Sequence, residues 1–163
     1  MKKCKVGVVG IGRGRMVWRF CNDADNAEIV AICDKWAEGL KNVKEQLATD
    51  TITYYEDFDE FLKHDMDVVI LVVTDLDGKS AQDYADDYYD YNGYGIGDDY
   101  SGMLLLIATE SRDWWISTCG EAIYVLTDYG IESIFSDFAG YLSVNDYYHA
   151  FETYLDCLPE YFD

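Results

Sequence analysis

Apolar runs of strand length recur in the first half of the chain at helix-length intervals. They cover residues 5–10 (KVGVVG), 28–34 (EIVAICD) and 68–73 (VVILVV). Short runs rich in Val and Ile are typical of strands buried on both faces of a parallel sheet. Strands that alternate with helices are joined by right-handed crossovers. We therefore predict an α/β fold with a three-layer, Rossmann-like, doubly wound sheet.

The segments between and after these runs complete the expected order of elements. A polar ESRD loop between residues 102–109 and 114–118 predicts an antiparallel hairpin at one edge of a mostly parallel sheet. Capping residues predict helices that start after Ser80, at Thr127 or Asp128, and at Ser143. In the first half we expect helices over residues 13–21, 35–48 and 57–63, and a short strand over 52–55.

The composition changes abruptly near residue 67. Residues 1–66 hold 10 basic and 12 acidic side chains, whereas residues 67–163 hold 2 and 20, so the net charges are −2 and −18. Thirteen of the 15 tyrosines also lie in the second part. This boundary falls beside the VVILVV strand rather than in a linker, and a central strand cannot be divided between two cores. We therefore expect one domain over 1–163, in which the two halves share a sheet and have a chimeric origin.

The charge and cysteine content exclude several classes of protein. A formal net charge of −20 repels nucleic-acid backbones and anionic lipid headgroups. No stretch reaches the roughly 18 apolar residues of a membrane span. The five cysteines are scattered and form no C-x-x-C pair, which argues against a disulfide framework. We expect a cytoplasmic protein with no nucleic-acid partner and no membrane span.

A glycine-rich turn follows the first apolar run, where a helix should begin. Gly10, Gly12 and Gly14, with Arg13, would let backbone N–H groups approach a pyrophosphate at the helix N-terminus. Asp34 ends the second run, where a carboxylate binds the ribose of NAD and disfavours the 2′-phosphate of NADP. The standard G-x-G-x-x-G pattern needs its third glycine at position 15. This chain has Arg15 there, and Gly14 comes one residue early. Two interpretations remain open: an NAD-type cofactor site formed by these five residues, or a turn without a ligand.

Residues 1–72 resemble the N-terminal Rossmann half of the glucose-fructose oxidoreductase and inositol dehydrogenase (Gfo/Idh/MocA) family. The resemblance rests on VGVVGIGRGRM, on EIVAICD, and on YYEDFDEFL followed by DMDVVIL. In that family a Glu-Lys-Pro motif, whose lysine serves catalysis, would follow the fourth strand. Here Thr74 is followed by Asp75 and the motif is absent. The resemblance therefore implies a dinucleotide-binding module without the dehydrogenase's catalytic half.

Residues 67–163 resemble the TPM domain family. The similar segments are DVVILVVTDLDGKSAQDYADDYYDYNGYG, SGMLLLIATESRDWWISTCGEAIYVLTD and DYYHAFETYLD. Some members of that family are reported as acid phosphatases and most are functionally obscure. The resemblance thus leaves a TPM-like phosphatase or a divalent-cation-binding domain as an alternative function.

Aspartates in the second half suggest where such a cation would bind. Asp98, Asp99 and Asp128 are expected in loops flanking the hairpin, and converging carboxylates suit calcium or magnesium. The same residues would also serve as helix N-caps and solvated loop charges. Trp114 and Trp115 alternate across a strand, so one packs inward and the other is available to a protein partner. An interaction protein that uses exposed aromatic side chains is the third functional hypothesis.

Overall fold

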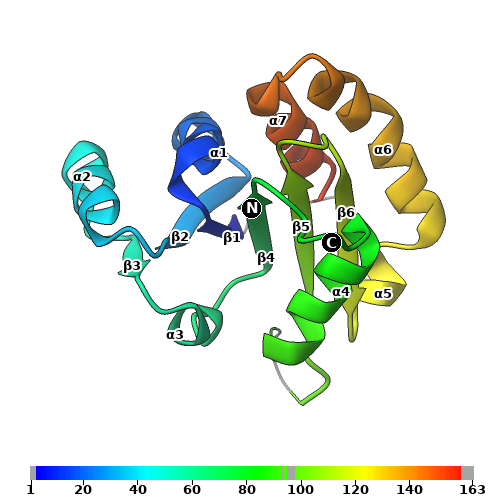
Figure 1. The fold of residues 1–163 in the computed structure, drawn as a ribbon, viewed down its shortest axis with the longest axis horizontal. Helices are drawn as coiled ribbons and strands as arrows, with labels where there is room; N and C mark the ends of the chain where they lie inside the picture. The colour runs from blue at the N-terminus through cyan, green and yellow to red at the C-terminus, as the bar shows by residue number, and fades with distance from the viewer. Residues whose placement is uncertain (1–2, 93, 95–97, 159–163) are drawn as a thin grey trace.

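A computed structural model of the protein describes residues 3–92, 94 and 98–158. Six strands form one sheet in the order β3-β2-β1-β4-β5-β6, in which only β5 and β6 are antiparallel neighbours (Figure 1). The mostly parallel, doubly wound sheet with a hairpin at one edge is confirmed. The strands are β1 (Cys4–Val9), β2 (Ala27–Cys33), β3 (Thr53–Tyr55), β4 (Val68–Val73), β5 (Gly102–Ala108) and β6 (Trp114–Cys119).

Helices cover both faces of this sheet. The described helices are α1 (Ile11–Asp23), α2 (Ala37–Leu47), α3 (Phe58–Leu62), α4 (Ala81–Asn92), α5 (Ala122–Val125), α6 (Asp128–Ser143) and α7 (Tyr147–Cys157). Buried residues of α1, α2, α6 and α7 form one core with the sheet, and those of α3 and α4 form a second core on the opposite face. Within the described residues, no helix is both long enough and apolar enough to cross a lipid bilayer.

Two helix starts differ from the sequence-based expectation. The first helix begins at Ile11 rather than at residue 13, so Gly12, Arg13 and Gly14 lie inside α1. Ser143 was expected to begin the last helix but ends α6. The actual N-cap of α7 is Asp146, whose carboxylate accepts a hydrogen bond from the His149 backbone N–H at 3.2 Å. The chain reverses between the two helices at a residue with φ of 59°, Asn145.

Both compositional halves contribute to each core. On one face, Trp18 of α1 lies in the same apolar cluster as Phe151 of α7. On the other face, Phe61 of α3 shares a cluster with Tyr89 of α4. The side chains of Phe61 and Phe151 are fully buried. The compositional boundary near residue 67 therefore has no counterpart in the packing.

Gly7, in the middle of β1, makes room for the helix that covers it. A Cβ atom at Gly7 would collide with the Met66 Sδ and lie 2.8 Å from the Phe61 Cζ, and both of these side chains are fully buried. We expect Gly7→Ala to lower the free energy of unfolding by about 1–3 kcal/mol, the cost of overpacking a core. Urea denaturation measures this loss. Gly140→Ala on α6 is the control, because a Cβ there meets no described atom within 4 Å; equal stabilities of the two variants would contradict the prediction.

Candidate functional site

The glycine turn lies at the point where the sheet changes winding direction. The parallel strands β1 and β4 are neighbours, but the helices that follow them, α1 and α4, cover opposite faces. In open α/β sheets such a switch point leaves a crevice at the carboxyl ends of the strands, where ligands commonly bind. Gly10 connects β1 to α1 at this switch point.

Gly10 is required by the fold itself. Its φ is 94°, and a Cβ atom there would lie 2.7 Å from the Val72 carbonyl oxygen of the neighbouring strand. A residue with a side chain would suffer both backbone strain and a collision with the main chain. Gly12 differs, because a Cβ atom added there would have no described heavy atom outside its immediate backbone within 4 Å. The backbone conformation and the close approach of β4 therefore require glycine at position 10. No described contact requires glycine at position 12, where the missing side chain leaves room for a ligand.

Asp34 ties the end of β2 to the beginning of α1. Its Oδ2 accepts a hydrogen bond from the Ile11 backbone N–H at 2.9 Å, and its Oδ1 accepts one from the Trp36 backbone N–H at 2.9 Å. The turn is closed further by the Gly10 backbone N–H, which donates to the Cys33 carbonyl at 3.0 Å. A carboxylate offers about four lone-pair sites. Asp34 is thus held rigidly by two donors and keeps acceptor capacity on both oxygens.

The first turn of α1 carries an unusual charge distribution. It contains no acidic residue, and three of the chain's four arginines lie in this helix: Arg13, Arg15 and Arg19. Basic residues near a helix N-terminus lie at the positive end of the helix dipole, which is unfavourable unless an anion is present. The amides of the first turn also have no acceptor within their own helix. The Asp34 carboxylate accepts from the first of these amides, that of Ile11, so a bound anion would use the amides that follow it.

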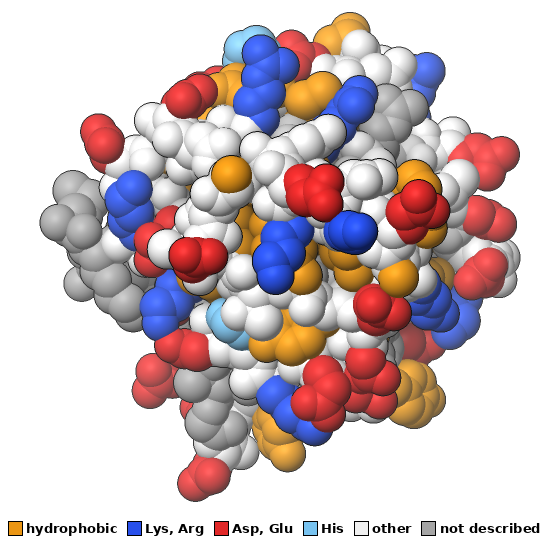
Figure 2. Space-filling view, turned by 90° about the vertical axis from the view of Figure 1, so that its left-hand side faces the viewer, with side chains coloured by type: hydrophobic (Ala, Val, Ile, Leu, Met, Phe, Trp, Pro, Cys, Tyr) orange, Lys and Arg blue, Asp and Glu red, His pale blue; other side chains and the backbone are white. Residues whose placement is uncertain are grey.

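A groove of about 660 Å³ runs along the outer surface between α1 and α2 and begins beside this turn. Gly12 and Arg15 line one side and Trp36 lines the other. The Trp36 ring packs on Gly39, where a Cβ would lie 2.7 Å from the Trp36 Cδ2, yet 60% of Trp36 remains exposed. The face shown in Figure 2 carries Lys and Arg side chains interspersed with acidic ones, in keeping with the balanced charge of residues 1–66.

Cys33 is the nearest nucleophilic side chain to Asp34, but its surroundings keep it protonated. Burial raises the pKa of the Cys33 thiol to about 12, and the neighbouring Asp34 charge acts in the same direction. The thiolate is the reactive form of cysteine. Burial of Cys33 therefore disfavours the thiolate form that a nucleophile requires.

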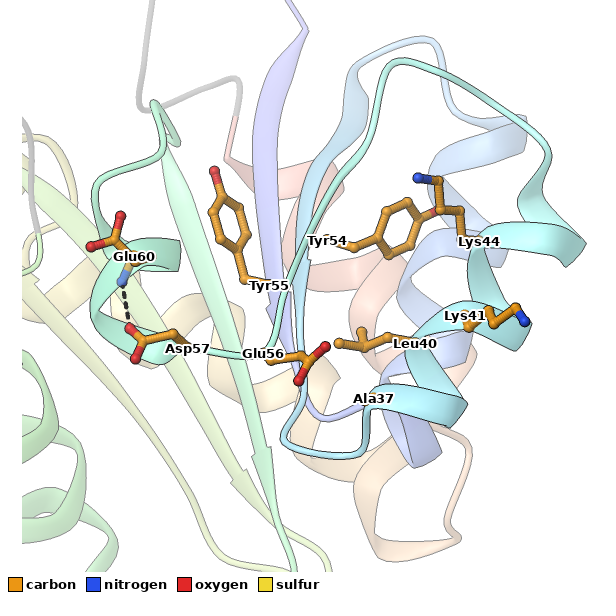
Figure 3. A pocket seen from close by; sticks show the side chains of 9 residues that line it. All are labelled: Ala37, Leu40, Lys41, Lys44, Tyr54, Tyr55, Glu56, Asp57 and Glu60. Carbon is orange, nitrogen blue, oxygen red and sulfur yellow. Dashed lines mark hydrogen bonds between the residues drawn. The ribbon is translucent and has the colours of Figure 1, made fainter.

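A second pocket, of about 550 Å³, opens beside the edge strand β3 (Figure 3). Lys44 of α2 lies over the Tyr54 ring, with its Nζ 5.9 Å from the ring centroid. Tyr55 points to the other side of the strand and its hydroxyl lies 2.9 Å from the His64 Nδ1. The pocket mixes lysines with Glu56, Asp57 and Glu60 and contains neither the glycine turn nor Asp34. It lacks the convergent donors that an anion requires.

The structure does not bring together the three aspartates that suggested a cation site. Asp99 lies in the turn before β5, where its Oδ2 accepts a hydrogen bond from the Ser101 hydroxyl at 3.2 Å. Asp128 is instead the first residue of α6 and lines a groove with Trp114 and Phe135. In the part of the chain that the structure describes, which includes Asp98, no group of three or more His, Cys, Asp or Glu side chains is placed to hold a metal ion. The cation-binding hypothesis gains no support from this geometry.

Comparison with protein families finds a match to the TPM domain over residues 34–161. The match begins 33 residues before residue 67, so it includes α2, β3 and α3 as well as the acidic half. UPF0603 protein YdjH of Bacillus subtilis (strain 168) is 31% identical over 93 residues, which are 57% of this chain and 35% of that protein. The chain thus matches about a third of the length of this relative.

Solved structures that match part of this chain include several dehydrogenases. Apo scyllo-inositol dehydrogenase from Lactobacillus casei is 22% identical, with a TM-score of 0.47, over 67% of this chain and 29% of that chain. WlbA dehydrogenase from Bordetella pertussis is 20% identical, with a TM-score of 0.44, over 67% and 30% of the two chains. Both resemblances expected from the sequence are therefore found again by comparison, and only the starting point of the TPM match differs.

Proposed function

The chain belongs to the TPM domain family, and we propose that this member binds an NAD-type dinucleotide at the turn between β1 and α1. The observation that carries the proposal is the fixed Asp34 carboxylate beside the first turn of α1. A ribose hydroxyl donates to a carboxylate, and a pyrophosphate accepts from helix N-terminal amides. Asp34 contacts the first turn of α1 through the Ile11 N–H, so the groups that would bind the ribose and the pyrophosphate lie side by side.

Asp34 also favours one form of the cofactor. Its two backbone donors hold the carboxylate at the end of β2, where the 2′ position of an adenosine ribose lies in dinucleotide-binding folds. A negative charge there attracts a hydroxyl and repels a phosphate. The preferred cofactor is therefore NAD rather than NADP.

We propose a binding module rather than a dehydrogenase. Oxidation of an alcohol by hydride transfer to NAD requires a base that takes the proton from the substrate hydroxyl. No Glu-Lys-Pro motif follows β4, and the thiol nearest to the turn is held protonated by burial. We expect no NAD reduction with a polyol or sugar, and NAD-dependent turnover that is lost in Asp34→Asn would overturn this part of the proposal.

The sharpest test uses Gly12, because a side chain there obstructs a ligand without obstructing the fold. We expect wild type to bind NAD with Kd below about 1 mM and Gly12→Val to bind at least about tenfold more weakly, a loss of about 1.4 kcal/mol. Isothermal titration calorimetry with NAD and NADP measures both values. Gly140→Val is the matched control, since that glycine is also helical and unobstructed but lies on α6.

A second variant tests the role of Asp34. Asp34→Asn keeps one acceptor oxygen but loses the charge, so we expect NAD binding to weaken by about 1–3 kcal/mol, the scale of a hydrogen bond to a charged group. Binding of NADP should weaken less or improve. If wild type binds neither dinucleotide below about 1 mM, the glycine turn is structural only and the proposed function is wrong.

A further inference from the structure

The groove between α1 and α2 begins at the two residues that hold Asp34 in place (Figure 1). The Asp34 carboxylate accepts hydrogen bonds from the backbone N–H groups of Ile11 and Trp36, both at 2.9 Å. Both of these donor residues line the groove, whose volume is about 660 Å³. Small-molecule sites commonly measure about 300–1,000 Å³. A ribose bound at Asp34 would therefore lie at one end of a groove large enough for the base that it carries.

Trp36 is an unusual residue for its position. It is the N-cap of α2, where Ser, Thr, Asp or Asn would accept a hydrogen bond from the helix, and its side chain makes no such bond. Its side chain is also 60% exposed, although large aromatic rings contribute most to stability when they are buried. Neither helix capping nor core packing explains a tryptophan here. An exposed indole ring is, however, a stacking surface for a planar base.

Gly39 allows the Trp36 ring to rest against the helix backbone. A Cβ atom at Gly39 would lie 2.7 Å from the Trp36 Cδ2 and 2.5 Å from the Ile11 Cδ1. Gly39 is buried inside α2, where glycine weakens a helix relative to alanine. The ring is thus seated on α2 beside the first residue of α1, and its exposed part borders the groove.

The opposite wall of the groove supplies positive charge. Among the described residues that line the groove, Arg15 and Arg19 are charged and none is acidic. The two arginines lie one turn apart on α1, and Arg15 is one turn from Ile11, which reaches the seat of the Trp36 ring. Arg15 is therefore the nearer of the two arginines to that ring. A guanidinium plane stacks on aromatic rings and on nucleic-acid bases.

We propose that the adenine ring of the dinucleotide lies in this groove, stacked on Trp36 and covered by Arg15. The proposal rests on the proposed function, because it extends the ligand held at Asp34 and at the first turn of α1. Gly12 lines the groove as well, so a pyrophosphate at the amides that follow Ile11 and a base in the groove form one continuous site. Asp34 then selects the ribose, and Trp36 selects the planar base.

Fragments of the cofactor show which part of it the protein holds. ADP-ribose keeps the adenine and the pyrophosphate, whereas nicotinamide mononucleotide lacks the adenine. By isothermal titration calorimetry, we expect ADP-ribose to bind as tightly as NAD and nicotinamide mononucleotide to bind at least about tenfold more weakly. Equal affinities of NAD and nicotinamide mononucleotide would overturn the proposal, because the adenine would then contribute nothing to binding.

Substitution of Trp36 tests the stacking directly. We expect Trp36→Leu to weaken the binding of NAD and of ADP-ribose by at least about fivefold, the lower end of what base stacking on an aromatic ring contributes. Trp36→Phe keeps an aromatic face and should retain most of the affinity. Tyr124→Leu is the matched control and should change nothing, because Tyr124 is an exposed aromatic residue on α5. Circular dichroism checks that each variant is folded.

The two arginines provide a second matched pair. Arg15→Gln and Arg19→Gln remove the same charge from the same groove, but we expect only Arg15→Gln to weaken ADP-ribose binding clearly. Equal losses in the two variants would overturn the stacking role of Arg15, because a general effect of charge would explain both.

The outcomes also separate this proposal from the proposed function. If wild type binds NAD and Gly12→Val weakens that binding, but Trp36→Leu binds as wild type does, the adenine lies elsewhere and only the present proposal is wrong. Equal losses in Trp36→Leu and Trp36→Phe would likewise overturn stacking. If wild type binds neither NAD nor ADP-ribose, both proposals are wrong.

Discussion

Replacing Gly10 with valine is expected to lower the free energy of unfolding by about 2–6 kcal/mol, the sum of backbone strain and overpacking at about 1–3 kcal/mol each. The φ of 94° disfavours any side chain, and a Cβ atom would lie 2.7 Å from the Val72 carbonyl oxygen. That oxygen belongs to the central strand β4 and cannot move without disturbing the sheet. Since domains are stabilised by about 5–15 kcal/mol, the loss is a large fraction of the total.

Gly12→Val provides the control for this experiment. The two glycines belong to the same turn, but only Gly10 is confined by the protein. Urea denaturation followed by circular dichroism should therefore show a strongly shifted midpoint for Gly10→Val and an almost unchanged one for Gly12→Val. Equal stabilities of the two variants would mean that the backbone at Gly10 relaxes, and that the strain argument is wrong.

Truncation of Phe61 or Phe151 to alanine is expected to destabilise the protein by about 3–5 kcal/mol in each case. Both side chains are fully buried, but they lie on opposite faces of the sheet and in opposite compositional halves. We propose that residues 1–163 form one domain, because the sheet is shared by both cores. Each substitution should then lower the midpoint of one and the same unfolding transition.

Thermal and urea unfolding, followed by tryptophan fluorescence and circular dichroism, measure this coupling. Phe135→Ala is the control, because that ring is 41% exposed and its loss removes less buried area. Two separate transitions, of which Phe61→Ala shifts only one and Phe151→Ala only the other, would show independent cores and contradict the proposal of a single domain.

The order of elements could be predicted from the sequence because local patterns dictate it. Runs such as VVILVV are typical of strands buried on both faces of a sheet. The helix-length segments between these runs indicate right-handed crossover connections between parallel strands. The start of α1 could not be predicted, because it depends on Asp34, which is 23 residues distant in sequence from the Ile11 amide that donates to it. A helix end that is capped by a remote side chain carries no local signal.

The candidate site divides in the same way. The chain's sequence by itself determined that a glycine turn and an acidic residue follow the first two strands, because residue types and spacing are local properties. Only the tertiary structure decided that Gly10 is required by Val72, that Gly12 is unobstructed, and that Asp98, Asp99 and Asp128 form no common site. It also decided that β6 is the last strand of the sheet and lies beside an apolar groove. These properties arise where the sheet brings distant segments together, and no stretch of sequence contains that information.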